Sequence, residues 1–187
     1  MHPEAYYFFL SSLRTLPKRG AVVEIGARNV NGSLRQLFIE NPPPVYVGVD
    51  IAPGPLVDVV ADGAEYKPAF MPDTVLSAEV LEHTAQAEAI CRNAHDMLAP
   101  GGLFLVSAAA EPRAPHSAVD GGGLREGEYY RNVNPQELRE WLSLSGFHIH
   151  SVQHDTNRGD VYAVAWKPKW LSSRCDTGAD VPGGGAA

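Results

Sequence analysis

The sequence predicts an α/β protein with a mostly parallel sheet and one antiparallel strand at its edge. Short apolar runs rich in β-branched residues, typical of buried parallel strands, alternate along the chain with segments of helical spacing. Towards the C-terminal end, two runs of period-two alternation are joined by a polar turn, which indicates a β-hairpin. A length of 187 residues suits a single domain with a proper core, which we expect to span residues 1–171.

The first half of the chain contains most of the expected strands. "HPEAYYFFLSSLRTLP" predicts a short amphipathic helix within residues 1–17, because Pro17 cannot continue it. Leu34, Leu37 and Phe38 stand at i, i+3 and i+4 and predict a second helix in "NGSLRQLFIE". The apolar runs predict strands at residues 21–26, 45–51, 57–61, 73–78 and 103–110.

Two further helices and the hairpin complete the pattern. The spacing of Ile90, Ala94 and Leu98 predicts a helix that ends at "APGG". A later helix has Asn134 as its N-cap, with proline at its first position, and ends at Gly146. "FHIHSVQ" and "DVYAVAWKP" then form the hairpin across "HDTNRG".

Composition limits the classes of function. A net charge of −7 and a pI near 5.4 argue against a broad basic face for nucleic acid. Cys91 and Cys175 match no metal or disulfide pattern, so no metal is expected, and Cys91 fits a small buried residue of a helix. "AYYFFL" is too short to cross a bilayer and follows no basic region, so we expect a cytoplasmic protein with no membrane contact. Residues 172–187 are expected to form a disordered tail.

A long irregular segment covers residues 111–132. It contains "DGGG" and many polar residues, and it exceeds the length of ordinary connections in a compact domain. Loops of this length often carry function, and this one follows the fifth strand. We therefore expect it to lie over the substrate side of a binding site.

Acidic residues and glycines gather where the expected strands end. In such sheets, ligands bind beyond the carboxyl ends of the strands, where the strand order reverses. Glu24 is a carboxylate in an otherwise apolar strand and needs a partner, while Gly26 lets the backbone approach a ligand. Asp50 ends the second strand, in the place of an acid that accepts both hydroxyls of a ribose, although a turn aspartate is the alternative. Asp62 precedes Gly63 after the third strand, where it could contact an adenine amino group or simply make a turn.

"LSAEVLEH" places two glutamates and a histidine at the end of the fourth strand. The alternative to a functional site is a solvated helix start, with acids near the positive end of the helix dipole. That alternative explains Glu82 well and Glu79 less well.

Taken together, "VVEIGARNVNGS", "YVGVDIAPGPLVDVVADG", "LSAEVLEH" and "LAPGGLFLVS" resemble a class I S-adenosylmethionine-dependent methyltransferase. The chain is most similar to the small methyltransferases with "EVLEH" after the fourth strand. The resemblance covers residues 21–108 and extends, through "NPQELREWLSLSGF" and the hairpin, to about residue 167. It implies a Rossmann-like doubly wound sheet of seven strands, mostly parallel with an antiparallel last strand. It also implies S-adenosylmethionine as cofactor and S-adenosylhomocysteine as product.

The resemblance assigns roles by position. The Gly26 turn packs on the methionine part of the cofactor, Asp50 binds the ribose hydroxyls, Asp62 meets the adenine, and Glu79 lies near the amino-acid end. Arg28 stands where a second glycine is common, and it could pair with the cofactor carboxylate or with Glu24. The expected cofactor-binding residues are Glu24, Gly26, Arg28, Asn31, Asp50, Ile51, Asp62, Gly63 and Glu79.

The acceptor side is expected to carry the remaining chemistry. Methyl transfer is an in-line displacement that depends mainly on orientation, with a base needed for an O–H or N–H nucleophile. His83 and His116 are the candidate catalytic residues, because an imidazole accepts a proton near neutral pH. Tyr129, Tyr130 and Arg131, in "GEYYRNVNP", could line the acceptor pocket or merely fix the loop.

Three other classes of protein can be weighed against the sequence. A nicotinamide-dependent oxidoreductase would need G-x-G-x-x-G, but Arg28 and Val30 follow Gly26. A DNA amino-methyltransferase would need an Asn/Asp-Pro-Pro-aromatic motif where "SAEV" stands. A non-catalytic module that binds S-adenosylmethionine or a partner remains an alternative. For the enzyme, we expect a small-molecule or glycan acceptor, with methyl transfer to oxygen or nitrogen.

Overall fold

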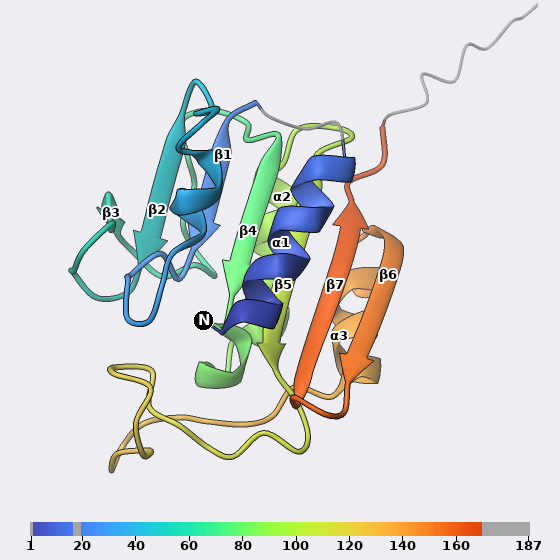
Figure 1. Ribbon diagram of the computed structural model, residues 1–187. Helices are drawn as coiled ribbons and strands as arrows, with labels where there is room; N and C mark the ends of the chain where they lie inside the picture. Colours follow the sequence, from blue (N-terminus) through green and yellow to red (C-terminus); the bar gives the residue numbers. More distant parts are fainter. Residues whose placement is uncertain (1, 17–19, 170–187) are drawn as a thin grey trace, which may run out of the picture.

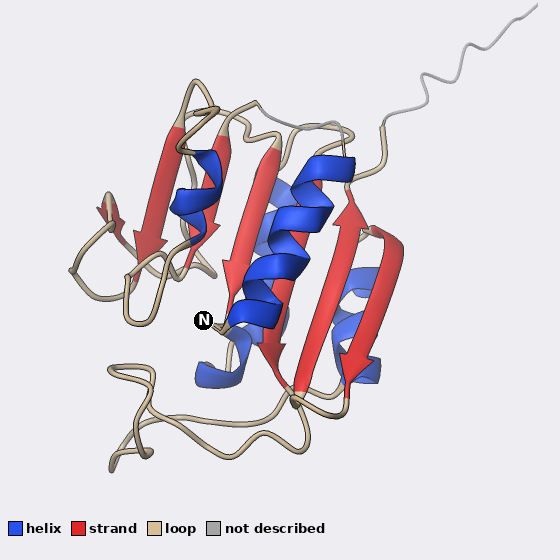
Figure 2. Cartoon of the chain, in the orientation of Figure 1, coloured by secondary structure: helices blue, strands red, loops and turns tan. Residues whose placement is uncertain are grey.

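A single seven-stranded sheet runs through the structure in the order β3-β2-β1-β4-β5-β7-β6 (Figures 1 and 2). The computed structural model describes residues 2–16 and 20–169. The strands are β1 (Val22–Ile25), β2 (Tyr46–Asp50), β3 (Val59–Val60), β4 (Thr74–Ala78), β5 (Leu103–Ala109), β6 (His148–Asp155) and β7 (Asp160–Trp166). The first five strands pair in parallel, and β7 runs antiparallel to both β5 and β6. The predicted class, a mostly parallel sheet with an antiparallel last strand, is confirmed.

The expected edge position of the antiparallel strand is wrong. β7 lies inside the sheet, between β5 and β6, and β6 forms the edge. The reason is the difference in polarity between the two hairpin strands. "DVYAVAW" is buried along nearly its whole length, whereas "HIHSVQHD" exposes alternate polar side chains. The more apolar strand is buried by pairing on both sides, and the polar strand faces solvent.

Helices cover both faces of the sheet (Figures 1 and 2). The helix α1 (Pro3–Thr15) and the 3₁₀ helix η1 (Leu34–Phe38) pack on one face. The helices α2 (Ala87–Met97) and α3 (Pro135–Leu144) pack on the other, and the short 3₁₀ turn η2 (Leu81–His83) follows β4. Successive side chains of a strand point to opposite faces of the sheet, so the buried residues form two hydrophobic cores, one on each face. For example, Val75 belongs to the α2 and α3 side and Leu76 to the α1 side.

The local signals in the sequence explain how most of these elements begin and end. The Asn134 side chain accepts a hydrogen bond from the backbone N–H of Gln136 at 2.8 Å, which confirms the predicted N-cap of α3. The helix predicted around Leu34 is only a five-residue 3₁₀ helix. Ser33 caps its start, and the prolines at 42–44 leave little chain for a longer helix. Cys91 is fully buried on α2, as predicted.

The segment 111–132 contains no helix or strand and passes beneath the carboxyl ends of β1, β2 and β4 (Figure 1). At this end of the sheet the loop lies beside the short η2 turn that follows β4 (Figure 1). No helix among the described residues is long and apolar enough to cross a membrane. The predicted tail at 172–187, with Cys175, lies outside the described residues.

Candidate functional site

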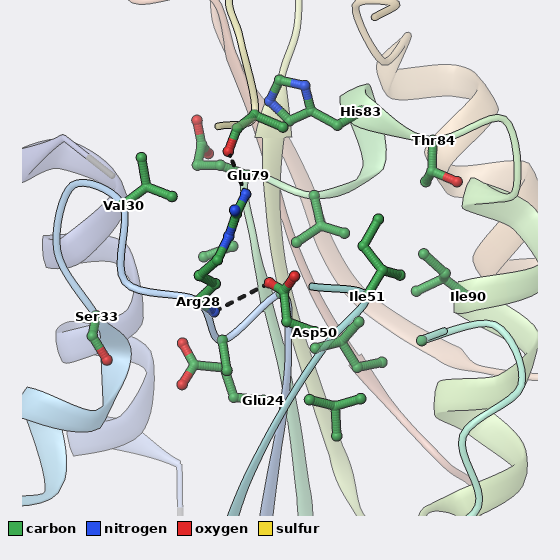
Figure 3. Close-up of a pocket in the computed structure, with 18 of the residues that line it drawn as sticks. Glu24, Arg28, Val30, Ser33, Asp50, Ile51, Glu79, His83, Thr84 and Ile90 are labelled. Atoms are coloured by element: carbon green, nitrogen blue, oxygen red, sulfur yellow. Dashed lines mark hydrogen bonds between the residues drawn. The ribbon is translucent and has the colours of Figure 1, made fainter. Parts of the chain in front are cut away.

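A pocket of about 280 Å³ opens at the carboxyl ends of β1, β2 and β4 (Figure 3). The strand order reverses at this point, because the chain leaves β1 towards β2 and β3 and returns on the other side at β4. All nine residues predicted to bind the cofactor line the pocket, together with both candidate histidines. The structure therefore brings together side chains from five separate stretches of the sequence.

The turn after β1 forms the floor of the pocket. Gly26 has a φ of +79°, and a β-carbon at this position would lie 2.1 Å from Val80 Cγ2. No other residue could keep this conformation and this contact without displacing the β4 turn. A β-carbon at Gly63 would similarly lie 2.4 Å from Ile25 Cγ2. Because both positions lack a β-carbon, the backbone at Gly26 packs directly against Val80 and the backbone at Gly63 packs directly against Ile25.

Asp50 anchors the turn and still faces the pocket. Its Oδ2 accepts the backbone N–H of Arg28 at 3.2 Å, and its Oδ1 accepts that of Ala52 at 3.0 Å (Figure 3). A carboxylate has about four acceptor positions, so two remain for further donors. Asp50 thus combines the role of a turn aspartate with the capacity to bind two hydroxyls.

Asp62 is more fully engaged than Asp50. Its Oδ1 accepts the Ala64 N–H at 2.8 Å in a turn, and its Oδ2 accepts the Gln86 side-chain amide at 2.8 Å. Gln86 also lines the pocket. The sequence could not predict this position, because no motif around Gln86 indicates that its side chain faces inward. Together, Asp62 and Gln86 place donors and acceptors at this end of the pocket.

Arg28 extends across the pocket from the Asp50 turn towards Glu79 (Figure 3). Its guanidinium donates to the backbone oxygen of Ala118 at 3.0 Å, while its Nε is buried without a hydrogen-bond partner among the described residues. The alternative pairing with Glu24 is not observed. Asn31 donates to the backbone oxygen of Asp120 at 3.4 Å, so the turn after β1 holds the long loop at two points.

Glu24 is almost completely buried beneath the floor of the pocket. Its partner is Tyr46, whose hydroxyl donates to the carboxylate at 2.6 Å. Burial raises the pKa of Glu24 to about 7, against the opposing effects of the Tyr46 hydrogen bond and the nearby Arg35 charge. The sequence correctly indicated that this acid needs a partner but could not identify it.

Glu79 adopts a backbone conformation that is unusual for its residue type. Its φ is +57°, and its side chain accepts from Ser107 Oγ at 2.8 Å and lies 3.6 Å from the Arg113 guanidinium. Such strain persists only where the surrounding structure enforces it, and it is frequent at functional sites. The strained backbone turns the chain from β4 into η2 and brings His83 to the pocket.

Three rings meet at the end of the pocket beneath the long loop. The rings of His83 and His116 lie 4.9 Å apart, and Tyr130 contacts both, with centroids at 5.4 and 5.0 Å. Burial, and then the neighbouring His116, lower the pKa of His83 to about 4, so this ring is neutral at pH 7. The Tyr130 hydroxyl donates to Asn132 at 2.8 Å. The structure thus assembles a histidine pair and a tyrosine from two distant segments.

The alternative of a solvated helix start, which explained Glu82 well from the sequence, is wrong. Its side chain is fully buried, and neither carboxylate oxygen has a hydrogen-bond partner among the described residues. Burial, and then the charge of Glu79, raise the pKa of Glu82 well above its ordinary range. The short η2 turn, in place of a regular helix start, directs the side chain inward.

None of the three residues expected on the acceptor side, Tyr129, Tyr130 and Arg131, lines the pocket itself. Tyr129 is exposed and does not line the pocket. Arg131 donates to Glu137 at 3.0 Å and lies over the Trp141 ring, so it fixes the loop to α3. Of the two roles that the sequence left open, these contacts favour loop fixation for Arg131, and only Tyr130 packs on the histidines.

Sequence reasoning missed an ionic network behind Glu79. Arg113, from the long loop, pairs with both Asp160 and Glu79, and His2 lies 3.0 Å from Asp160. Burial opposes ionisation of Asp160, but the His2 hydrogen bond and the His2 and Arg113 charges outweigh it and lower the pKa of Asp160. These residues come from the start, middle and end of the chain and share no local motif, so only the fold could reveal them.

Comparison with family models identifies the class of protein. Residues 5–152 match the model of a methyltransferase domain. The matched region includes every residue that lines the pocket, since these fall between residues 24 and 121. Comparison with curated proteins gives no match.

Solved structures share the fold at low sequence identity. The 1,6-didemethyltoxoflavin-N1-methyltransferase of Burkholderia thailandensis, with bound 1,6-didemethyltoxoflavin and S-adenosylhomocysteine, has a TM-score of 0.63 at 18% identity, covering 89% of this chain and 78% of that chain. The N-methyltransferase NodS of Bradyrhizobium japonicum, bound to S-adenosylhomocysteine, has a TM-score of 0.62 at 16% identity, with coverage of 89% and 87%. A DhpI complex with S-adenosylhomocysteine gives 0.64 at 22% identity, with coverage of 88% and 85%.

The chain belongs to the methyltransferase domain family, as an S-adenosylmethionine-dependent enzyme with the Rossmann-like methyltransferase fold. The family match therefore agrees with the resemblance seen in the sequence motifs.

The raised pKa of Glu24 predicts how stability depends on pH. The folded-state pKa of about 7 exceeds the ordinary value of 4.5, so ionisation of Glu24 opposes folding. The stability that the folded protein gains by keeping Glu24 protonated is fully present below about pH 4.5 and is lost as the pH rises through 7. Glu24→Gln keeps an acceptor for Tyr46 but cannot ionise. We expect denaturant unfolding to give similar stabilities near pH 5, and a variant more stable by about 1–3 kcal/mol near pH 8.

Glu40→Gln is the matched control, because Glu40 is exposed. It should follow the wild-type dependence on pH. The account of Glu24 would be contradicted if Glu24→Gln also followed the wild-type curve up to pH 8.

Proposed function

We propose that the pocket holds S-adenosylmethionine with its ribose at Asp50, its adenine near Asp62 and Gly63, and its methionine part over the Gly26 turn. The residues fit such a ligand. Asp50 retains acceptor capacity towards the pocket, and the Gly26 backbone is open to close approach. The observation that carries the assignment is the buried Nε of Arg28, unpartnered among the described residues, which lies at the methionine end and suits a carboxylate.

The proposed acceptor site lies between the methionine end and the long loop. When bound, the cofactor supplies an electrophilic methyl group on a sulfonium. The protein must hold the nucleophile in line with the departing sulfur at about 3 Å and exclude water. The contacts of Arg28 and Asn31 with residues 118–120 hold the loop over this end of the pocket.

His83 and His116 are placed to act on the proton of the acceptor. A carbonyl oxygen only accepts hydrogen bonds, so the contact of His116 Nδ1 with Ala114 at 3.2 Å makes Nδ1 the donor and leaves Nε2 as an acceptor. His83 is neutral but, with a pKa near 4, a weak base. Of the two, His116 is therefore the better candidate for general base.

We further propose a small molecule, or a small group on a sugar-like acceptor, with transfer to oxygen or nitrogen. The long loop, held over this end of the pocket by its contacts with Arg28 and Asn31, leaves room for a compact acceptor. Two of the structural relatives are named as N-methyltransferases, and one holds 1,6-didemethyltoxoflavin. The acidic net charge of −7 argues against nucleic acid as the acceptor.

The proposed cofactor site makes a prediction for Asp50→Ala. Loss of hydrogen bonds from two hydroxyls to a carboxylate should weaken binding of S-adenosylhomocysteine by about 1–3 kcal/mol, or roughly 5- to 150-fold. Isothermal titration calorimetry on the folded variant measures this change. Asp96→Ala serves as the control, because Asp96 is exposed on α2 outside the pocket. Unchanged affinity in folded Asp50→Ala would reduce Asp50 to a turn residue.

The proposed acceptor side is tested by screening acceptor pools with methyl-labelled cofactor. Once an acceptor is found, His116→Ala should lower turnover by about 10²-fold if His116 is the base, with affinity for S-adenosylhomocysteine nearly intact. Tyr7→Ala, an exposed aromatic on α1, is the control and should leave both quantities unchanged. Equal losses of cofactor affinity and turnover in His116→Ala would place the loop on the cofactor side and contradict the assignment.

A further inference from the structure

Glu82, His83 and His116 form a compact set of metal-ligating groups at the acceptor end of the pocket. One ligand atom from each lies within 4.8 Å of the others, and Glu82 Oε1 is 4.0 Å from His83 Nε2. Two of the three come from the rigid turn after β4, and the third comes from the long loop. The set therefore spans the boundary between the sheet and the loop.

The burial of Glu82 requires an explanation. A fully buried carboxylate without a hydrogen bond is expensive, and such groups are normally paired or bound to a metal. Among the described residues, His83 Nδ1 is also buried without a partner. Arg113 is the nearby cation, but it already pairs with Asp160 and Glu79. Glu82 is thus the acid of this region without a direct cationic partner or a hydrogen bond of ordinary geometry in the part of the chain that the structure describes, and only the backbone N–H groups of Glu82 and Ala109 approach its carboxylate.

The orientation of His116 matches that of a metal ligand. Histidines that bind metals usually donate the other ring N–H to a backbone carbonyl or a carboxylate, which fixes the tautomer. The Nδ1 of His116 makes this contact with the backbone oxygen of Ala114 at 3.2 Å, so Nε2 carries the free lone pair. Tyr130 packs against both imidazoles and restricts their rotation.

A second set of the same residue types provides a contrast. His2, Glu79 and Asp160 also bring their ligand atoms within 4.8 Å of one another. There, however, the Arg113 guanidinium pairs with both carboxylates, and Ser107 and Tyr162 donate to them at 2.8 and 3.0 Å. The carboxylates of this second set are thus paired with cations and hydrogen-bond donors of the protein, whereas the Glu82 carboxylate of the first set has no such pairing among the described residues.

We propose that Glu82, His83 and His116 bind a divalent transition-metal ion, with Zn²⁺ as the best-suited probe. Two imidazoles and one carboxylate are a ligand set for zinc or for non-haem iron, whereas Mg²⁺ and Ca²⁺ prefer oxygen. Bond lengths of about 2.0–2.2 Å require the three ligands to close in by roughly 1 Å. The side chains of Glu82 and His83 must rotate towards each other to shorten their 4.0 Å separation, and His116 approaches them with the loop that carries it. The ion then ties the loop to η2.

This site also bears on the chemistry of the acceptor, and that part of the inference rests on the proposed function. Three protein ligands leave coordination positions open. Because His83 and His116 line the pocket, these positions face the acceptor space. An acceptor hydroxyl bound there would be oriented by the ion and its pKa lowered, so that its proton would pass to solvent water and its oxygen would take the methyl group as the carbon–sulfur bond breaks; the ion would then replace His116 as the activating group. The favoured acceptor class is then a molecule with a metal-coordinating oxygen.

The experiment is a metal titration of the full chain, prepared without a histidine tag and stripped with a chelator. Zn²⁺ is titrated in competition with a chromophoric chelator, and Co²⁺ binding is followed by its visible absorption. We expect about one tight equivalent of Zn²⁺ and a Co²⁺ spectrum with histidine ligation. Glu82→Gln and His116→Ala should each weaken the tight site by about 100-fold or more, exceeding the 10–100-fold effect of outer-shell groups. Glu82→Gln keeps the shape of the side chain and places no charge in the core, so it should fold.

Matched controls separate this site from adventitious binding. His148 and His150 are exposed on β6, and replacing both with alanine should keep the tight equivalent. The inference is overturned if the stripped protein binds no tight Zn²⁺, if Glu82→Gln binds it as well as the wild type, or if the control variant loses it. Calorimetry with S-adenosylhomocysteine on the same stripped protein tests the proposed cofactor site separately from the metal site. Retained binding of that ligand without a tight metal site would refute the metal site alone.

Discussion

The end of β1 lies against the end of β4 at Gly26, where a β-carbon would come within 2.1 Å of Val80 Cγ2. Only glycine permits this close approach beside the parallel pairing of β1 with β4, the two strands between which the chain order reverses. The close approach also sets the path of the chain beyond β4, through the strained Glu79 and into η2. The floor of the pocket, the burial of Glu82 and the inward direction of His83 all follow from that path.

Carboxylates line the pocket or lie just behind its wall, and their hydrogen-bond and ionic partners differ from one to the next. Asp50 accepts backbone N–H groups, Glu24 accepts a tyrosine hydroxyl, and Glu79 shares Arg113 with Asp160. Glu82 alone among these five is buried without a hydrogen-bond partner in the described part of the chain. The differences divide the pocket into a hydrogen-bonded half suited to a ribose and a carboxylate-rich half, beside two imidazoles, suited to a cation and an acceptor.

The fold could be predicted largely from local patterns, and the site only in part. Strand ends can be located by periodicity, so the sequence alone places Gly26, Asp50 and Asp62 at one edge of the sheet. The sequence could not show that "DVYAVAW" is inserted next to β5, because that choice depends on competition between two strands for burial. Nor could it reveal the partners of Glu24 or Glu79, since Tyr46, Ser107 and Arg113 are contributed by other strands and the loop. Glu82 was misjudged because a surface acid and a buried one look alike in "EVLEH".

The central claim is that the edge where β1, β2 and β4 end binds a sulfur-containing nucleoside cofactor. Calorimetric titration of the full chain with S-adenosylhomocysteine and, separately, with NAD tests it most directly. Both ligands carry an adenosine, so the comparison isolates recognition of the methionine part by the Gly26 turn and Arg28. The account predicts saturable binding of S-adenosylhomocysteine and no detectable binding of NAD. Binding of NAD with no response to S-adenosylhomocysteine would contradict it.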